Sequence, residues 1–289
     1  MSVPSVAGFQ SLPGETVPVI PPVPAEIFEK RAARLRSLAP GHAIGEYLEA
    51  MARLTEAQIA ALQVFPPQSE KHFEPAPSLN ACSHNYGEIW QKALGVIISR
   101  MQRVPLPEES QAALSRLNAA APAALEFTAQ TMICGNYDSV DLATSPFLAA
   151  ALQVYWTDLA SRIKFDAMEQ TPYVCPVCGS APVAGVILGD RKLRYLCCSL
   201  CATHWYIPRL TCTKCGSTAN LVYFAVEGDE NKIKAEACNR CHTYLKLFYL
   251  ENNPEAEAFT DDLATLALDL LISDKSYNRS GINLFLLRK

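Results

Sequence analysis

The chain has no hydrophobic run long enough to cross a membrane, because nothing in it approaches about 18 uninterrupted apolar residues. Its first 24 residues carry no Lys or Arg and are interrupted by six prolines. They therefore lack both the charged region and the apolar region of a secretory signal. We expect a cytoplasmic protein that has no membrane partner.

Familiar catalytic motifs are also missing from the sequence. It contains no Gly-rich phosphate-binding loop, no HExxH zinc motif and no nucleophile elbow. Asp261 and Asp262 stand at the start of an expected helix, where the helix dipole favours acidic residues without any catalytic role. We therefore expect no catalytic residues.

Cysteine, by contrast, is abundant and regularly spaced. Eight of the 11 cysteines form four C-x-x-C pairs. The pairs are Cys175/Cys178, Cys198/Cys201, Cys212/Cys215 and Cys238/Cys241. One such pair can hold one face of a tetrahedral metal ion, and two pairs complete a Cys₄ site. The sequence therefore predicts two metal ions, each bound by four thiolates.

The spacing favours pairing in sequence order, which gives one site from 175 to 201 and a second from 212 to 241. Gly179 and Gly216 follow the first pair of each site, where a tight turn needs a residue that tolerates unusual backbone angles. Ala202 and His242 follow the second pairs, so those turns are expected to be less regular. Crossed pairing stays open but requires longer loops, and Cys₄ sites accept either iron or zinc.

Structural disulfides are a poor explanation for these pairs, because C-x-x-C pairs in a cytosolic chain indicate metal or redox chemistry. The isolated Cys82 and Cys134 are interpreted as small, buried apolar residues. Cys197 adjoins a metal ligand on an expected strand and points away from it. A thiol-based sulfur or redox transfer enzyme is the alternative function, and Cys197 would be its reactive residue.

The segments between the cysteine pairs predict strands, because they are rich in Val, Ile, Tyr, Phe and Trp and end at polar turns. The expected strands are 183–188, 194–198, 203–211, 221–226, 232–237 and 243–249. Each module is then a small antiparallel sheet with a metal ion at one end. Because so small a unit buries little apolar surface, the ion would supply folding free energy.

Apolar residues at three- and four-residue steps predict helices before the first cysteine pair. The expected helices include 25–38, 108–117, 122–133 and a stripe over 89–101, and Ser145-Pro146 starts a largely apolar central helix. A last helix begins after Asn253-Pro254, with the stripe Phe259, Leu263, Leu266 and Leu270.

The predicted fold is α+β. An N-terminal helical domain precedes two tandem rubredoxin-like or zinc-ribbon Cys₄ modules, and a C-terminal helix packs back on the helical domain. The expected segments are a flexible N-terminus (1–20), the helical domain (21–170), the first module (171–209), the second module (210–252), and the C-terminal helix and tail (253–289).

The charge balance argues against nucleic acid as a partner. Residues 171–253 carry nine Lys or Arg against six Asp or Glu, an excess of +3. Two divalent ions, each held by four thiolates, would bring this region to about −1, and the whole chain carries −4. Binding to phosphates through counterion release needs a strongly basic surface.

Several stretches together resemble a known family. They are 20–22, 30–36, 45–48, 149–156, 175–180, 193–196, 198–201, 233–236, 243–246, 261–264 and 277–285. With the four C-x-x-C pairs set among them, they resemble FdhE, the formate dehydrogenase accessory protein. The resemblance covers roughly residues 18–287.

This resemblance implies a cytoplasmic maturation factor required for active formate dehydrogenase. Such proteins are thought to bind the catalytic subunit of respiratory molybdenum or tungsten enzymes before export, and they are not known as enzymes. The cysteine turns look like those of rubredoxin, and iron has been associated with the family.

Overall fold

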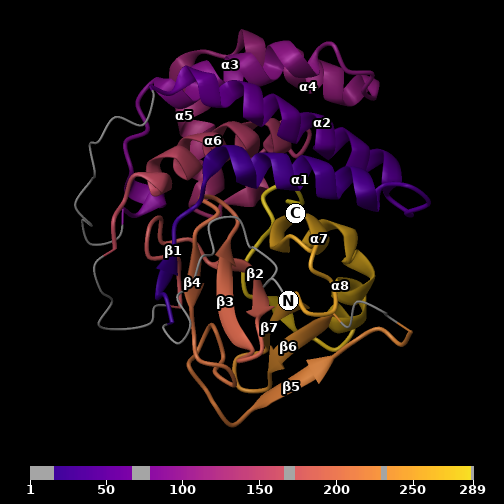
Figure 1. Cartoon of the computed structure of the whole chain (residues 1–289). Coiled ribbons are helices and arrows are strands. Elements are labelled where there is room, and N and C mark those ends of the chain that lie inside the picture. The colour runs from indigo at the N-terminus through magenta and orange to yellow at the C-terminus, as the bar shows by residue number, and fades with distance from the viewer. Residues whose placement is uncertain (1–15, 67–78, 166–172, 229–232, 288–289) are drawn as a thin grey trace.

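The chain folds as a helical layer above a sheet layer (Figure 1). The computed structural model describes residues 16–66, 79–165, 173–228 and 233–287. In the described residues, no helix combines the length and the apolar character that a membrane span requires.

The helical layer precedes the cysteine-rich region, as the apolar spacing predicts. It contains α1 (Pro24–Leu38), α2 (Gly45–Ala61), α3 (Ile89–Met101), α4 (Glu108–Ala119), α5 (Pro122–Ile133) and α6 (Ser145–Ser161). Short 3₁₀ turns lie at η1 (Leu62–Val64), η2 (Ala81–Ser83) and η3 (Tyr137–Ser139). Proline begins α1 and α5, where its fixed backbone angle suits the first helical turn. α6 is buried on most of its surface and lies at the centre of the layer.

The sheet layer joins both cysteine modules into one sheet. Its strands are β1 (Val19–Ile20), β2 (Pro182–Leu188), β3 (Leu193–Cys198), β4 (His204–Tyr206), β5 (Leu221–Phe224), β6 (Lys234–Cys238), β7 (Thr243–Tyr249) and β8 (Asn278–Arg279). The order is β1-β4-β3-β2-β7-β6-β5, and β8 also pairs with β7.

The strands of each module are antiparallel, whereas β2 and β7 pair in parallel and connect the modules. This junction differs from the two separate small sheets expected from the sequence. Its physical reason is that every residue of β2 is buried, so this strand needs neighbours on both edges and cover on both faces. The expected boundary at 209/210 thus falls between the two cysteine groups, which belong to one sheet. The division into domains stays a prediction.

The N-terminal segment joins the sheet before residue 20, where its flexible part was expected to end. Residues 1–15 of the segment predicted to be flexible lie outside the described residues. Val19 and Ile20, however, are buried and pair with Trp205 and His204 of β4. The expected boundary at residue 20 is therefore wrong for these two residues, because their side chains complete the core at the edge of the sheet.

The C-terminal region forms two helices, α7 (Ala258–Ala264) and α8 (Leu266–Ser273), where the sequence predicts one. The break falls at Thr265, whose hydroxyl donates to the Asp261 carbonyl at 2.7 Å. α7 packs on α1, which places it against the helical layer as predicted. The break turns α8 away, so that Leu270 is 61% exposed instead of completing the predicted stripe.

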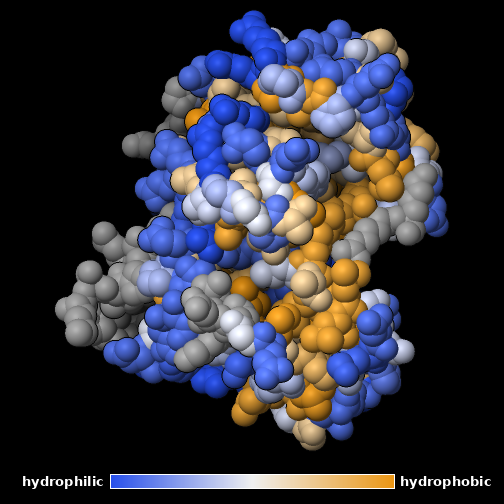
Figure 2. Space-filling view, turned by 90° about the vertical axis from the view of Figure 1, so that its right-hand side faces the viewer, coloured by the Kyte–Doolittle hydropathy of each residue, from blue (hydrophilic) through white to orange (hydrophobic). Residues whose placement is uncertain are grey.

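Seen from the side of α8, apolar residues gather in a band between the two layers and down the sheet layer (Figure 2). The buried apolar side chains of the described residues form two cores. The larger core fills the helical layer and extends to the first four cysteines, including Cys175 and Cys198. The smaller core lies between the sheet and α8 and contains Phe248, Leu268 and Ile272. The first cysteine group is therefore part of the main core of the chain.

Candidate metal centre

The first candidate site consists of Cys175, Cys178, Cys198 and Cys201, whose sulfur atoms all lie within 4.8 Å of one another. Cys175 Sγ lies 3.4 Å from Cys201 Sγ, and Cys178 Sγ lies 3.4 Å from Cys198 Sγ. A tetrahedral ion with metal–sulfur bonds of about 2.3 Å places its ligand sulfurs about 3.8 Å apart. The group therefore has a size that could hold one metal ion.

The second candidate site consists of Cys212, Cys215, Cys238 and Cys241. Its two cross-turn sulfur distances are 3.6 Å for Cys212–Cys241 and 3.8 Å for Cys215–Cys238. All four cysteines of the first group are buried, but Cys215 and Cys241 are only half-buried. The cysteines are thus grouped in sequence order, and the second group lies closer to solvent.

All four cysteine turns contain a left-handed residue at the same position. The residue after the second cysteine has a positive φ in each turn, at +75° for Gly179, +58° for Ala202, +71° for Gly216 and +52° for His242. The expectation that the Ala202 and His242 turns are less regular is therefore wrong. In these turns the chain accepts the steric cost of a left-handed residue with a side chain, because the turn must direct both sulfurs to the same point.

Backbone amides of these turns point at the sulfurs. The amides of Leu200 and Cys201 both donate to Cys198 Sγ at 3.4 Å, and the amide of Lys214 donates to Cys212 Sγ at 3.4 Å. Hydrogen bonds of this kind stabilise a negatively charged sulfur and orient it.

A hydroxyl residue that the predictions from sequence did not include lies two positions after each pair. The four turns read C-x-x-C-x-S/T, with Ser180, Thr203, Ser217 and Thr243 in the last position. The hydroxyl oxygens of Thr203 and Thr243 lie 3.1 Å and 3.0 Å from the sulfurs of Cys201 and Cys241. The fourfold repeat of this short motif was the signal that could have identified these sulfur partners.

The helical layer holds the first cysteine group in place. Gln153 of α6 donates from Nε2 to the Ser199 carbonyl at 2.6 Å, within the Cys198–Cys201 turn. The amide of Ala81 donates to the Cys178 carbonyl at 2.9 Å. Two segments distant in the sequence therefore fix both turns of this group.

Electrostatics explain why these sulfurs need a cation. Burial raises the pKa of the Cys175 and Cys201 thiols well above the ordinary value. Four thiolates this close also repel one another. Because a metal ion both neutralises and coordinates thiolates, it is the partner that makes such a group stable in ionised form.

Cys197 is not placed for reaction with solvent. It is 3% exposed and belongs to the smaller core, on the opposite side of β3 from Cys198. Burial raises the pKa of the Cys197 thiol well above its ordinary value. A reactive cysteine needs access to solvent and a lowered thiol pKa. Cys197 has neither, so its position does not suit a nucleophile.

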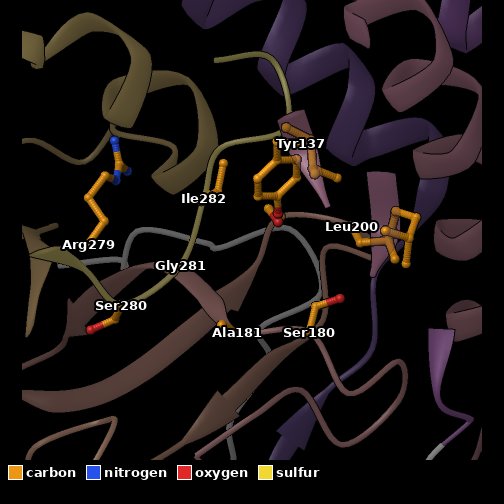
Figure 3. Close-up of a pocket in the computed structure, with 11 residues that line it drawn as sticks. Tyr137, Ser180, Ala181, Leu200, Arg279, Ser280, Gly281 and Ile282 are labelled. Atoms are coloured by element: carbon orange, nitrogen blue, oxygen red, sulfur yellow. The ribbon is translucent and has the colours of Figure 1, made fainter. Parts of the chain in front are cut away.

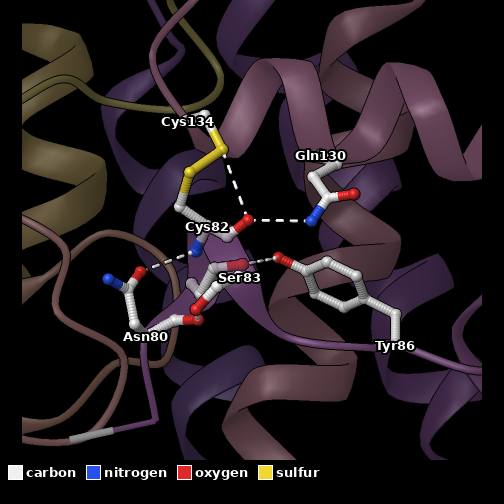
Figure 4. The surroundings of a disulfide bond; sticks show 7 residues. Asn80, Cys82, Ser83, Tyr86, Gln130 and Cys134 are labelled. Carbon is white, nitrogen blue, oxygen red and sulfur yellow. Dashed lines mark hydrogen bonds between the residues drawn. A yellow bond between two sulfur atoms is a disulfide. The ribbon is translucent and has the colours of Figure 1, made fainter.

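Cys82 and Cys134 form a disulfide, and both residues are exposed (Figure 4). Their interpretation as buried apolar residues is therefore wrong. They are 52 residues apart in the sequence, so nothing local reveals their pairing. The bond joins the surface turn η2 to the end of α5, where Gln130 also donates to the Cys82 carbonyl at 2.8 Å. Because η2 contacts the Cys178 carbonyl through Ala81, the disulfide braces a contact of the first cysteine group.

A cavity of about 250 Å³ opens beside the first cysteine group (Figure 3). Ser180 and Leu200 line it from the cysteine turns, Tyr137 from η3, and Arg279 and Gly281 from the C-terminal segment. A Cβ atom at Gly281 would lie 2.2 Å from the Pro182 carbonyl oxygen, so the segment approaches β2 as closely as only glycine allows. The C-terminal segment thus forms one wall of a cavity beside the first cysteine group.

Comparison with known families places matches along nearly the whole chain. Residues 16–172 match the model "FdhE, N-terminal", residues 174–209 match "FdhE, central domain", and residues 210–286 match "FdhE, C-terminal domain".

Individual relatives agree with these matches. The chain is 36% identical to "Protein FdhE homolog" of Serratia proteamaculans, over 96% of this chain and 95% of that protein. It is 35% identical to "Protein FdhE homolog" of Yersinia pestis over the same shares. It is also similar to the crystal structure of the FdhE protein from Pseudomonas aeruginosa, with a TM-score of 0.84 and 34% identity, over 93% of this chain and 99% of that one.

Proposed function

Because this chain belongs to the FdhE family, we propose that it is an accessory protein of formate dehydrogenase, the role that its sequence resemblance implies. It would bind the catalytic subunit of the respiratory enzyme in the cytoplasm, during assembly and before export. The observation that carries the proposal is family membership across all three segments, joined to two Cys₄ groups built into one sheet.

The eight cysteines of the two groups would bind one metal ion each, either iron or zinc. The distances between sulfurs, the burial of the first group and the amides that point at the sulfurs all support tetrahedral thiolate coordination. Elemental analysis of anaerobically isolated protein should find two ions per chain. Thiolate-to-iron absorption would identify iron, and a colourless protein with two bound ions would identify zinc.

We propose a binding function instead of an enzymatic one. The alternative, a thiol-based sulfur or redox transfer enzyme, needs an accessible cysteine outside the metal groups. Cys197 is buried. Alkylation of the protein with both metals bound should therefore leave Cys197 unmodified, and its rapid modification would favour the enzyme.

The metal modules offer the surface for the partner subunit. Five of the ten large apolar side chains that are exposed in the described residues lie between 173 and 226, around the two cysteine groups. They are Tyr173, Val174, Leu210, Tyr223 and Val226. Exposed apolar side chains on a rigid scaffold are typical of protein–protein contacts.

The decisive experiment is capture of the catalytic subunit from cytoplasm by the tagged chain. Val174→Asp and Leu210→Asp should reduce capture, because each places a charge on the proposed surface. Phe127→Asp is the matched control, since Phe127 is 74% exposed but lies on α5 of the helical layer. Failure to capture the subunit, together with normal formate oxidation in cells that lack this protein, would overturn the proposal.

The Cys82–Cys134 disulfide allows the proposed cytoplasmic location to be tested. Disulfides are rare in reducing compartments, whereas Cys82 and Cys134 are bonded and exposed. Mass spectrometry of protein alkylated within cells would report their state there. Two alkylated thiols would agree with the cytoplasm, and a persistent bond would indicate an oxidising location.

A further inference from the structure

A small cavity lined by strands of the sheet and by the segment between β4 and β5 carries an excess of positive charge. It has a volume of about 150 Å³. Arg194 of β3, Arg209 of the segment between β4 and β5, and Lys234 of β6 line it, and Glu236 of β6 is the single carboxylate that lines it among the described residues. Three cations against one carboxylate give a local charge of +2. This charge stands out in a chain whose net charge is −4.

The one carboxylate is already satisfied. Glu236 Oε1 accepts a hydrogen bond from Arg194, and its Oε2 accepts one from the Tyr223 hydroxyl at 2.7 Å. Arg194 and Glu236 are both buried, at 1% and 5% exposure. Glu236 is therefore engaged by its own partners and is not available to neutralise the other two cations.

Those two cations have no counter-ion within the described residues. Neither Arg209 nor Lys234 forms a hydrogen bond or ion pair there, although the Lys234 ammonium lies 5.5 Å from the centre of the Tyr249 ring. The Tyr249 hydroxyl likewise has no hydrogen-bond partner among residues that the structure describes. Burial raises the pKa of Tyr249 above its ordinary value, so the hydroxyl keeps its proton as a donor.

Arg194 fixes the wall of the cavity in place. Its Nη2 atom donates to the carbonyls of Pro208 at 2.6 Å and Thr211 at 2.7 Å, one on each side of Arg209. The Arg194 Nε atom is buried and has no partner among the described residues. The cations are thus presented by a braced loop and by strands of one sheet, which limits the entropy that binding would cost.

We propose that this cavity binds the phosphoryl group of a small ligand. A charge of +2 matches a dianion better than a singly charged carboxylate. Guanidinium, ammonium and hydroxyl donors on several sides suit the separate oxygen atoms of a tetrahedral group. The volume is below the 300–1,000 Å³ typical of whole-ligand pockets, so the cavity receives the phosphoryl group while the rest of the ligand remains outside.

The inference goes beyond the proposed function and needs no dehydrogenase for its test. The full-length protein with its metals bound would be titrated at constant ionic strength with inorganic phosphate, glycerol phosphate and acetate. Binding would be followed by calorimetry and by phosphorus NMR. Saturable binding of one phosphate or one glycerol phosphate per chain is expected, with acetate much weaker. Tighter binding of glycerol phosphate would identify a phosphate ester as the ligand type, and tighter binding of inorganic phosphate would identify the free ion.

Three variants locate the site. Arg209→Gln and Lys234→Gln should each weaken phosphate binding by roughly tenfold or more, the effect of losing one charge-assisted hydrogen bond. Lys192→Gln is the control, because it removes the same charge nearby from a residue that pairs with Glu251 and does not line the cavity. The proposal is overturned if neither phosphate compound binds, if acetate binds as tightly, or if Lys192→Gln weakens binding as much as Arg209→Gln.

Discussion

The buried ammonium of Lys246 offers a sharp test of how the C-terminal helices are held to the sheet. Lys246 lies on β7 with its side chain fully buried, 2.8 Å from Asp262 Oδ1 of α7 and 2.9 Å from Asp269 Oδ2 of α8. It also donates to the Asp262 carbonyl at 2.7 Å and to the Thr265 hydroxyl at 2.9 Å. One side chain therefore connects the sheet to both helices and to the break between them.

Lys246→Met should destabilise the protein by about 3 kcal/mol. Removing one partner of a buried ion pair costs about 3–5 kcal/mol, because the remaining charge loses its compensation. The lower end applies here since both carboxylates keep other donors. Arg279 pairs with Asp262 and Asp269, and the Tyr244 hydroxyl donates to Asp269 at 2.7 Å.

Urea denaturation at pH 7 would measure the change in the free energy of unfolding. Lys234→Met is the control, since this exposed lysine forms no ion pair with the described residues and should change stability by less than about 0.5 kcal/mol. Adding Asp269→Asn to Lys246→Met restores the charge balance and should recover part of the loss. If Lys246→Met costs under about 1 kcal/mol, or if the second change recovers nothing, the argument from charge compensation fails.

The stability loss in Lys246→Met should depend on pH. Although burial alone would raise it, the charges of Lys246 and Arg279 hold the pKa of Asp262 below its ordinary value. A depressed carboxyl pKa contributes stability above the unfolded pKa of about 3.9, and this contribution is lost as the pH falls through the folded value. The difference in unfolding free energy between wild type and Lys246→Met should therefore narrow below about pH 4. A constant difference would contradict the assigned role.

Three further outcomes are expected. A chelator should remove metal from the half-buried second group before the first, and simultaneous metal loss would refute this. Cys175→Ser should lower the thermal stability of the whole chain while Cys212→Ser acts locally, because only the first group lies in the main core. Ala202→Gly should raise the unfolding free energy by about 0.5–1 kcal/mol and Gly179→Ala should lower it by about 1 kcal/mol, since both positions have positive φ. Changes of the opposite sign in urea denaturation would refute this prediction. Cys82→Ser should lower the unfolding free energy by up to about 4 kcal/mol, because the unfolded chain regains the entropy that the disulfide removes by closing a loop of 52 residues. Elemental analysis should find the metal content unchanged.

The sequence by itself determined where the cysteine turns lie and most of the helices and strands. Four C-x-x-C pairs are local motifs, and their order favoured the grouping that the structure shows, because neighbouring turns need only short connections. Helix periodicity is local as well, so α1, α4 and α5 could be predicted nearly to their ends. The Ser or Thr two positions after each pair is part of an equally local motif, C-x-x-C-x-S/T, whose recurrence could have been read from the sequence.

Tertiary structure alone decided which distant segments meet. The parallel pairing of β2 with β7 joins strands about 60 residues apart, and the Cys82–Cys134 bond joins residues whose local sequence carries no trace of each other. A lysine of β7 contacts the break at Thr265, and the positive cavity depends on cations from two separate strands and a loop. These features arise from contacts between surfaces that exist only after each element has formed, so a pattern that is read along the chain cannot contain them.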